Sequence, residues 1–182
     1  MSGGYLSKVV FALAVGLSLP AYAAAADHDV DAQGAFKAAG CYIETPEGIV
    51  MAINRGWDSG KPTLQFPVGS RRGEESPQET VRREVSEELG VEQDDITIGR
   101  FIENINTEKY PVYLFSCTLK DVDRVTSLTP KDQGESLGSV IINPDKMTYE
   151  SGAKKGQAVD IPFRFAEDSE RAPRLFPQPL QP

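Results

Sequence analysis

The sequence predicts a single α/β domain with a mixed sheet. Short apolar segments of strand length are separated by turn residues, and one longer segment has the periodicity and end signals of a helix. The composition is that of an ordinary globular chain, since 40% of the 182 residues are hydrophobic and 25% are charged. This length leaves room for one domain with its own core, but not for a second full domain.

Charge and composition exclude several classes of protein. Nineteen Lys and Arg residues stand against 27 Asp and Glu residues, which gives a formal net charge of -8. A protein that binds a nucleic acid polymer through a broad basic surface is therefore disfavoured. The 16 Gly and 13 Pro residues show no period, which excludes a collagen-like chain. Two cysteines are too few for a disulfide scaffold.

The first 26 residues have the composition of a secretory signal peptide. They contain one base, Lys8, then the apolar run 9–19, and end in small residues that allow cleavage after Ala23 or Ala26. As a helix the apolar run would span only ~16 Å, about half of a bilayer core, so an uncleaved anchor is the weaker alternative. We therefore expect a periplasmic or secreted protein without stable membrane insertion after cleavage.

Export changes the interpretation of Cys41 and Cys117, which lie 76 positions apart. Disulfides persist in oxidising compartments, and closing a loop of this length would stabilise the fold by ~4 kcal/mol. However, both cysteines lie in apolar, strand-like segments, where cysteine is often only a small buried hydrophobic residue. Both interpretations stay open at this point.

The expected elements follow the apolar segments in order. Residues 39–45 and 49–54 are separated by Pro46-Glu47-Gly48 and predict a β-hairpin. A helix begins at the N-cap Ser76, with Pro77 at its first position and Glu79 completing a capping box, and ends at Gly90. The remaining strands are expected at residues 64–66, 96–105, 112–119 and 139–142.

The C-terminal part is less regular. Residues 160–165 have a strand-like pattern and residues 166–172 are long enough for two helical turns. Four prolines in the last eleven residues favour a tail that wraps the surface or stays extended. We therefore expect a signal peptide at 1–26, a domain at 27–165 and a proline-rich tail at 166–182.

The expected helix carries acids beside its buried face. At 100° per residue, three apolar side chains form a stripe that must face a core, and three carboxylates fall on one arc next to it. Like charges four residues apart repel each other by ~0.2 to 0.5 kcal/mol, so a cation should offset them. The stripe consists of Val81, Val85 and Leu89, and the arc of Glu84, Glu87 and Glu88.

Arg83 offsets part of this charge, because it is next to Glu84 and four residues from Glu87. Oxygen ligands without nearby His or Cys suit a hard ion such as Mg²⁺ or Mn²⁺, which keeps waters and shares a substrate phosphate. The single histidine, His28, lies near the mature N-terminus. Zinc binding or histidine-based catalysis is therefore poorly supported.

The acidic helix belongs to a longer motif. Gly69, Glu75 and the run from Arg83 to Val91 have the spacing of a complete Nudix box, preceded by Phe66-Pro67, so this region resembles the Nudix hydrolase family. A chance match has a probability on the order of 10⁻⁷ in a chain of this length. The order of strands between residues 39 and 142 also resembles the fold of that family.

The resemblance implies an α/β/α sandwich and a loop-helix-loop that binds a divalent metal and hydrolyses a diphosphate linked to another moiety. It implies that Glu75 supports the joint between loop and helix and that Arg83 orients the glutamates. Val68 stands where many members have the first of two glycines, which leaves the geometry of a backbone ligand at Gly69 open. The metal ligands implied are Glu84, Glu88, Glu87 directly or through water, and a backbone carbonyl at the turn that Gly69 permits.

The chemistry also suits the residues themselves. Metal ions neutralise a diphosphate and lower the pKa of water, and a carboxylate then removes or relays the proton. This base is either a box glutamate or an acid from a later loop, for which Glu135 is our candidate, followed by Glu103 and Glu108. An acid in such a loop is about as often an exposed side chain without a catalytic role as it is a ligand or base.

Candidates for substrate contacts lie in loops. Arg55 is positioned at a strand end to pair with a phosphate, and Trp57 or Tyr110 to stack on a base. Residues of these types more often belong to a loop surface or to the rim of a core.

The sequence therefore predicts an exported Nudix-type pyrophosphohydrolase that uses Mg²⁺ or Mn²⁺ and a small-molecule diphosphate substrate. Export favours nucleotide sugars, dinucleoside polyphosphates or isoprenoid diphosphates, and the oligomeric state is left open. The alternatives are a catalytically inactive Nudix-fold module that binds or senses a nucleotide, and an acidic structural domain that binds Ca²⁺. The intact set of Glu84, Glu87 and Glu88 favours the hydrolase.

Overall fold

The computed structural model describes residues 36–56, 60–105 and 110–176. The expected signal peptide at 1–26 lies outside these ranges, as do His28, Trp57 and Glu108. Within these ranges, no helix combines the length and the apolar character that a bilayer crossing requires.

The strands that the structure describes form two four-stranded sheets. In the first sheet only β1 and β6 run parallel, and in the second all neighbours are antiparallel. The first sheet has the order β4 (Val68–Ser70), β1 (Ala38–Ile43), β6 (Val112–Leu119), β5 (Ile96–Asn104). The second has the order β3 (Thr63–Gln65), β2 (Ile49–Asn54), β7 (Ser136–Asn143), β8 (Thr148–Tyr149).

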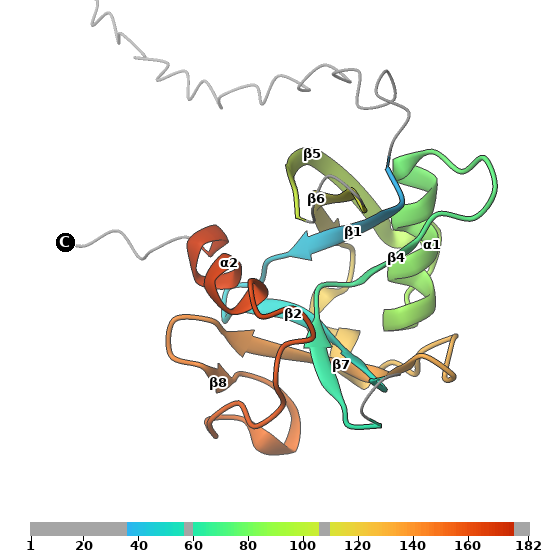
Figure 1. The fold of residues 1–182 in the computed structure, drawn as a ribbon. Coiled ribbons are helices and arrows are strands. Elements are labelled where there is room, and N and C mark those ends of the chain that lie inside the picture. Colours follow the sequence, from blue (N-terminus) through green and yellow to red (C-terminus); the bar gives the residue numbers. More distant parts are fainter. Residues whose placement is uncertain (1–35, 57–59, 106–109, 177–182) are drawn as a thin grey trace, which may run out of the picture.

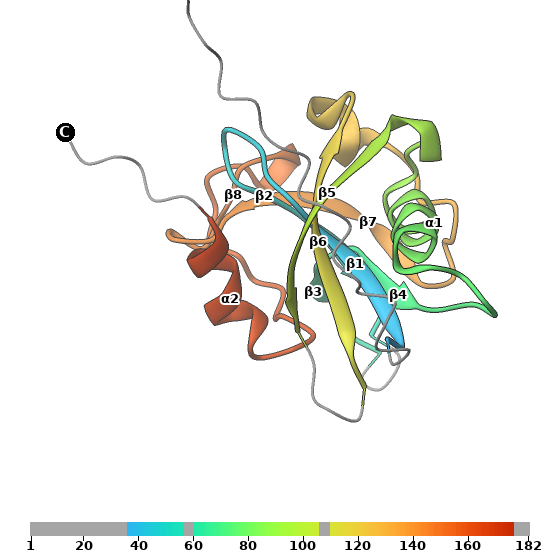
Figure 2. The same cartoon turned by 90° about the horizontal axis from the view of Figure 1, so that it is seen from above.

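Helices cover the sheets from two sides. Helix α1 (Pro77–Leu89) lies on one side and α2 (Asp168–Leu175) on the other, as Figure 1 and Figure 2 both show. Three short 3₁₀ turns complete the described elements: η2 (Gln93–Asp95), η3 (Val122–Ser127) and η4 (Gly152–Lys154). The α/β/α arrangement with a mixed sheet, which the sequence predicted, is therefore confirmed.

Strand β1 contributes to both apolar cores because its side chains alternate between two buried faces. Ala39, Cys41 and Ile43 pack in the cluster that contains the α1 stripe, whereas Tyr42 packs in the cluster that contains Ala172 of α2. Burial on both faces explains why β1 is a continuous apolar run instead of an alternating pattern.

The expected hairpin of residues 39–45 and 49–54 is not formed. β1 pairs with β4 and β6, and β2 pairs with β3 and β7, so both strands have both edges in use. Between them only Glu44 and Ile49 form an isolated bridge, next to the tight turn at residues 45–48. The turn was predicted correctly, but it carries the chain from one sheet to the other.

Helix α1 begins and ends where the sequence predicts. The Ser76 hydroxyl accepts a hydrogen bond from the Glu79 amide, and the Glu79 carboxylate accepts one from the Ser76 amide, at 3.3 and 2.8 Å. Gly90 ends the helix in the left-handed conformation, with φ of 76°. These caps fix which helical positions face the core and which face the neighbouring loop.

The C-terminal segment contains a helix where residues 166–172 were long enough for two turns, but the helix continues into the stretch that we expected to wrap the surface or stay extended. Residues 160–165 make only an isolated bridge, between Phe163 and Leu64, and residues 168–175 are helical. Ala172 is fully buried, and Leu175 and Phe176 pack against the same cluster. Packing therefore continues beyond the expected boundary at residue 165, and residues 172–175 are not extended.

The two cysteines are joined in a disulfide. The parallel pairing of β1 and β6 brings the Cα atoms of Cys41 and Cys117 to 5.7 Å, within the usual range for a bridge. Both residues also belong to the buried cluster beneath α1. Both interpretations left open by the sequence are therefore correct, because the two cysteines are bridged and are also small buried residues of the core.

Candidate active site

The loop between β4 and α1 is fastened to the helix through Glu75. Its carboxylate accepts hydrogen bonds from Nε and Nη2 of Arg83, at 2.7 and 2.8 Å, and from the Arg72 amide at 3.0 Å. The Thr80 hydroxyl donates a further bond at 3.2 Å. These bonds, those from Arg83 above all, lower the pKa of Glu75 to about 2. Glu75 thus lies at the joint between loop and helix, where the family resemblance places it.

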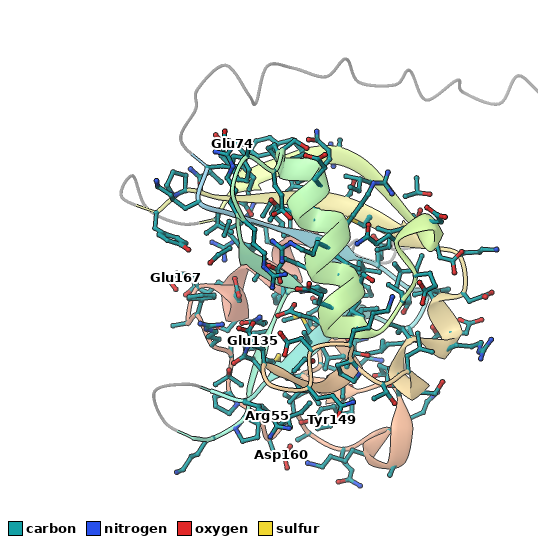
Figure 3. The ribbon with its side chains drawn as sticks, turned by 90° about the vertical axis from the view of Figure 1, so that its right-hand side faces the viewer. Arg55, Glu74, Glu135, Tyr149, Asp160 and Glu167 are labelled. Carbon is teal, nitrogen blue, oxygen red and sulfur yellow. A yellow bond between two sulfur atoms is a disulfide. The ribbon has the colours of Figure 1, made fainter. Side chains whose placement is uncertain are left out.

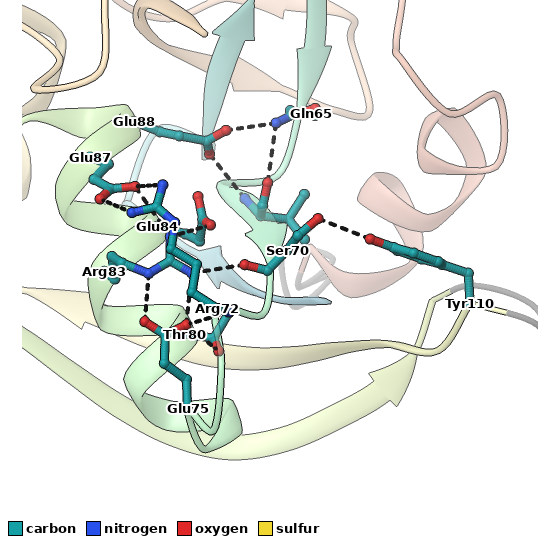
Figure 4. Close-up of polar contacts among 11 residues, drawn as sticks. Gln65, Ser70, Arg72, Glu75, Thr80, Arg83, Glu84, Glu87, Glu88 and Tyr110 are labelled. Atoms are coloured by element: carbon teal, nitrogen blue, oxygen red, sulfur yellow. Dashed lines mark hydrogen bonds and ion pairs between the residues drawn. The ribbon is translucent and has the colours of Figure 1, made fainter. Parts of the chain in front are cut away.

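Arg83 lies in the middle of the acidic cluster. Besides Glu75, its guanidinium donates to Glu84, to Glu87 at 3.2 Å and to the Ser70 carbonyl at 2.8 Å (Figure 4). The hydrogen bonds to Glu75 and Glu84 raise the pKa of Arg83 further above its ordinary value. One cation therefore holds three carboxylates and the end of β4 in fixed relative positions.

Glu88 is an almost completely buried carboxylate, with 3% of its surface exposed. It accepts one bond from Nε2 of Gln65 at 2.8 Å and one from the Val68 amide at 3.0 Å. Burial raises the pKa of Glu88 well above its ordinary value, and the negative charge of Glu84 raises it further. Within the described part of the chain, no Lys or Arg forms an ion pair with Glu88.

Glu84 is buried as well, although Arg83 contacts it. Its exposed fraction is 5%, and burial raises its pKa while the hydrogen bond from Arg83 opposes this shift. The side chains of Glu84 and Glu88 are therefore two neighbouring desolvated carboxylates on one helix. Such a pair is stabilised in its charged form when a cation shares it.

Gly69 has a different role from the one that we expected. It lies in β4, paired with Ala39, and not in a turn; the left-handed glycine of this loop is Gly73, with φ of 56°. A Cβ atom on Gly69 would lie 2.1 Å from Cδ of Glu84. Glycine is needed here because the buried carboxylate of Glu84 packs directly against the strand.

The donor set fits a hard divalent cation. Glu84 and Glu88 offer only oxygen atoms, and their charge is incompletely balanced by the protein. In the ranges that the structure describes, no group of three or more acidic, His or Cys side chains is arranged to hold a metal. Glu87 instead forms a two-bond ion pair with Arg72, at 2.8 and 3.0 Å. Glu84 and Glu88 would thus be the direct ligands, with substrate or water completing the coordination.

Glu135 comes from a distant loop to the C-terminal end of α1 (Figure 3). The neighbouring Ser136 donates a hydrogen bond to the Glu88 carbonyl at 2.9 Å, and the charge of Glu135 contributes to the raised pKa of Glu88. Our sequence candidate for a base in a later loop therefore lies beside the acidic pair. Glu103 does not, because it pairs with Arg171 and Arg174 of α2.

Arg55 supports the loop that carries Glu135. Its amide donates to the Glu135 carbonyl at 2.9 Å, and its Nε donates to the Gln133 carbonyl at 2.8 Å. These two bonds fix the position of the Glu135 loop relative to the site. This supporting role of Arg55 was not expected from the sequence, which suggested only a phosphate contact.

Two residues in the site were missed from the sequence. Gln65 is fully buried and contacts Glu88, and Arg72 pairs with Glu87. Gln65 could have been recognised from its position between the apolar residues Leu64 and Phe66, because a polar side chain that is buried with such neighbours needs a hydrogen-bond partner. Arg72 had no comparable signal, because its partner depends on how the loop turns back over the helix.

The fold and the acidic site are those expected of a Nudix protein, and comparison with known proteins confirms the family. The NUDIX domain family matches residues 35–157, and the chain therefore belongs to this family. A search among curated proteins finds no match.

Several solved structures have a similar fold. One is an ADP-ribose pyrophosphatase from Streptococcus suis 89-1591, with 15% identity and a TM-score of 0.52 over 76% of this chain and 86% of that chain. A Nudix hydrolase from Nitrosomonas europaea has 19% identity and a TM-score of 0.52, over 75% and 69%. RenU, a Nudix hydrolase from M. smegmatis, has 15% identity and a TM-score of 0.53, over 80% and 90%. At these identities the likeness establishes the fold, and together with the family match it supports a Nudix-type pyrophosphohydrolase.

Proposed function

We propose that this protein hydrolyses the pyrophosphate linkage of a nucleoside diphosphate linked to another moiety, with Mg²⁺ or Mn²⁺ as cofactor. The observation that carries the proposal is the neighbouring pair of buried carboxylates, Glu84 and Glu88, on the helix of the Nudix box. Their charged forms are unfavourable in this environment unless a cation balances them. A diphosphate brings its own negative charge and needs the same cation.

The residues of the site have separable tasks in this reaction. A bound divalent ion would neutralise the diphosphate and lower the pKa of the attacking water. Arg83 and Glu75 hold the glutamates in place, and Gln65 orients Glu88. The Glu135 carboxylate accepts the proton as the water oxygen bonds to phosphorus and the bridging P–O bond breaks.

The substrate class is supported by one of the similar structures, which is described as an ADP-ribose pyrophosphatase. The comparison supports a nucleoside diphosphate derivative as the class and leaves the second moiety open. A screen of the purified protein against such derivatives, with Mg²⁺ or Mn²⁺, would identify the substrate through its phosphate or mononucleotide products.

Glu88→Gln tests the proposal, because it keeps the size of the side chain and removes the charge. We expect the turnover rate to fall at least a hundredfold while the fold is retained, in line with the loss of a metal ligand. Glu74→Gln is the matched control, because the Glu74 side chain is fully exposed on the loop that precedes α1 and pairs only loosely with Arg71. Full activity of Glu88→Gln would contradict the ligand assignment. Tight nucleotide binding by the unaltered protein without any product would favour the inactive sensing module.

We also propose that the chain is exported to the periplasm or secreted. The composition of residues 1–26 supports export, and so does the disulfide between Cys41 and Cys117, since such bonds persist outside the cytosol. We expect the protein recovered from cells to begin after Ala23 or Ala26, as measured by N-terminal sequencing. A cytosolic protein that retains Met1 or Ser2 would refute this proposal.

A further inference from the structure

A cavity of about 480 Å³ borders the acidic site along β4. A volume of this size is typical of a small-molecule site. All three β4 residues line the cavity and each also contacts the acidic helix. Val68 donates its amide to Glu88, Gly69 packs against Glu84, and Ser70 accepts from Arg83. A ligand in the cavity would therefore be separated from the carboxylates by the width of one strand.

A second wall of the cavity comes from outside the region that the NUDIX family matches. The segment from Arg164 to Arg171 supplies four lining residues, and the family match ends at residue 157. The Arg164 amide donates to the Leu64 carbonyl at 2.7 Å, and its Nη1 donates to Gln65 Oε1 at 2.8 Å. Because Gln65 also contacts Glu88, this wall is connected to the proposed metal ligand through one side chain.

Two of the exposed large hydrophobic side chains of the described residues line this cavity. Tyr110 is 43% exposed and Phe165 is 37% exposed. The Arg164 guanidinium lies 5.4 Å from the centre of the Phe165 ring, and the Tyr110 hydroxyl makes a 2.9 Å hydrogen bond with Ser70 Oγ (Figure 4). Each ring is thus held by a polar neighbour and still offers surface to a ligand.

The charges in the cavity do not favour a second phosphate. Both arginines of the lining are already engaged, since Arg171 is paired with Asp168 and Glu103 and Arg164 donates to Gln65 Oε1. Glu167 adds a negative charge to the lining. The rest of the lining is mixed, with apolar side chains such as Ile105 and Val112 beside polar ones. A flat, uncharged ring suits this environment better than an anionic group does.

We propose that the cavity binds the nucleobase of the substrate and that Phe165 and Tyr110 are specificity-determining residues on which the base stacks. The inference rests on the proposed function, since it places the diphosphate at Glu84 and Glu88 on the other side of β4. It assigns recognition of the base to a C-terminal segment that the family match does not include.

The test compares ligands that differ only in the ring. With the full chain and Mg²⁺, calorimetry measures the Kd of AMP, GMP, CMP and UMP and the Kd of ribose 5-phosphate. We expect at least one mononucleotide to bind more tightly than ribose 5-phosphate. Phe165→Leu should weaken binding of that mononucleotide about 5- to 150-fold, the range that loss of one stacking contact causes, and leave binding of ribose 5-phosphate unchanged.

Phe101→Leu is the matched control, because Phe101 has a similar exposed fraction, 38%, and does not line the cavity. It should affect neither ligand, while Phe165→Tyr should retain mononucleotide binding. Tyr110→Leu provides a second variant if Phe165→Leu does not fold. In hydrolysis, both leucine variants should raise KM while kcat stays within about threefold.

Equal binding of mononucleotides and ribose 5-phosphate, or unchanged mononucleotide binding in Phe165→Leu and Tyr110→Leu, would overturn the base site. Neither result would affect hydrolysis that depends on Glu88. Conversely, ring-dependent binding without turnover would contradict the proposed function and leave the base site in place.

Discussion

The contact between Gly69 and Glu84 leads to a sharp prediction about Gly69→Ala. A Cβ atom at this position would lie 2.1 to 2.3 Å from the three atoms of the Glu84 carboxyl group, whereas ordinary contacts begin near 3.4 Å. The carboxylate would therefore have to retreat by about 1 Å, and a misplacement of this size near reacting groups costs about 100-fold in rate. We expect kcat to fall by about two orders of magnitude.

Stability should fall in the same variant, because the added atom enters a well-packed interior. Overpacking of this kind costs about 1 to 3 kcal/mol, which a thermal or denaturant unfolding curve would measure. In a Glu84→Ala background the same substitution should cost less, because the clashing carboxylate is absent. The double-mutant cycle thus attributes the loss to the contact between Gly69 and Glu84.

Gly73→Ala, in the loop that follows β4, is the control. Gly73 has φ of 56° and nothing near its Cβ position, so alanine there adds backbone strain of roughly 1 kcal/mol without displacing a side chain. Its kcat should stay within about threefold of the unaltered protein. If Gly69→Ala retains a normal kcat, or if its cost is the same with and without Glu84, the reasoning is refuted.

Two further predictions concern stability. Reduction of the disulfide, or the double substitution Cys41→Ala and Cys117→Ala, should lower the free energy of unfolding by ~4 kcal/mol, because a loop of 76 residues is no longer closed. A chemical denaturation curve measures this loss, and an unchanged midpoint would contradict a structural role of the disulfide. Glu75, whose pKa is lowered from 4.5 to about 2 chiefly by Arg83, stabilises the fold above pH 4.5 and loses this effect as the pH falls towards 2. The stability difference between the unaltered protein and Glu75→Gln should thus shrink by about 1 to 2 kcal/mol over that range, allowing for solvent screening, and a difference that does not change with pH would contradict the assignment.

The sequence was informative wherever residues close along the chain determine the structure. The start and end of α1 follow from Ser76, Glu79 and Gly90, whose contacts lie within one helical turn. The neighbouring positions of Glu84 and Glu88 follow from the helical repeat. The Nudix box and the α/β fold class could therefore be predicted without coordinates.

Contacts between distant segments were harder to predict. The turn at residues 45–48 looks the same whether its strands pair with each other or with other strands, and only the complete pairing of β1 and β2 shows the latter. Similarly, the sequence did not decide whether Cys41 and Cys117 are bridged, because this depends on the parallel alignment of β1 with β6.

The sequence by itself determined the family, the acidic helix and the chemistry that its carboxylates suit, because these depend on residue types at short, fixed spacings. Only the tertiary structure decided which groups meet those carboxylates: Gly69 against Glu84, Gln65 on Glu88, and the loop of Glu135 at the end of the helix. The physical reason is that burial and partner choice depend on how whole strands and loops pack, and therefore on the entire chain at once.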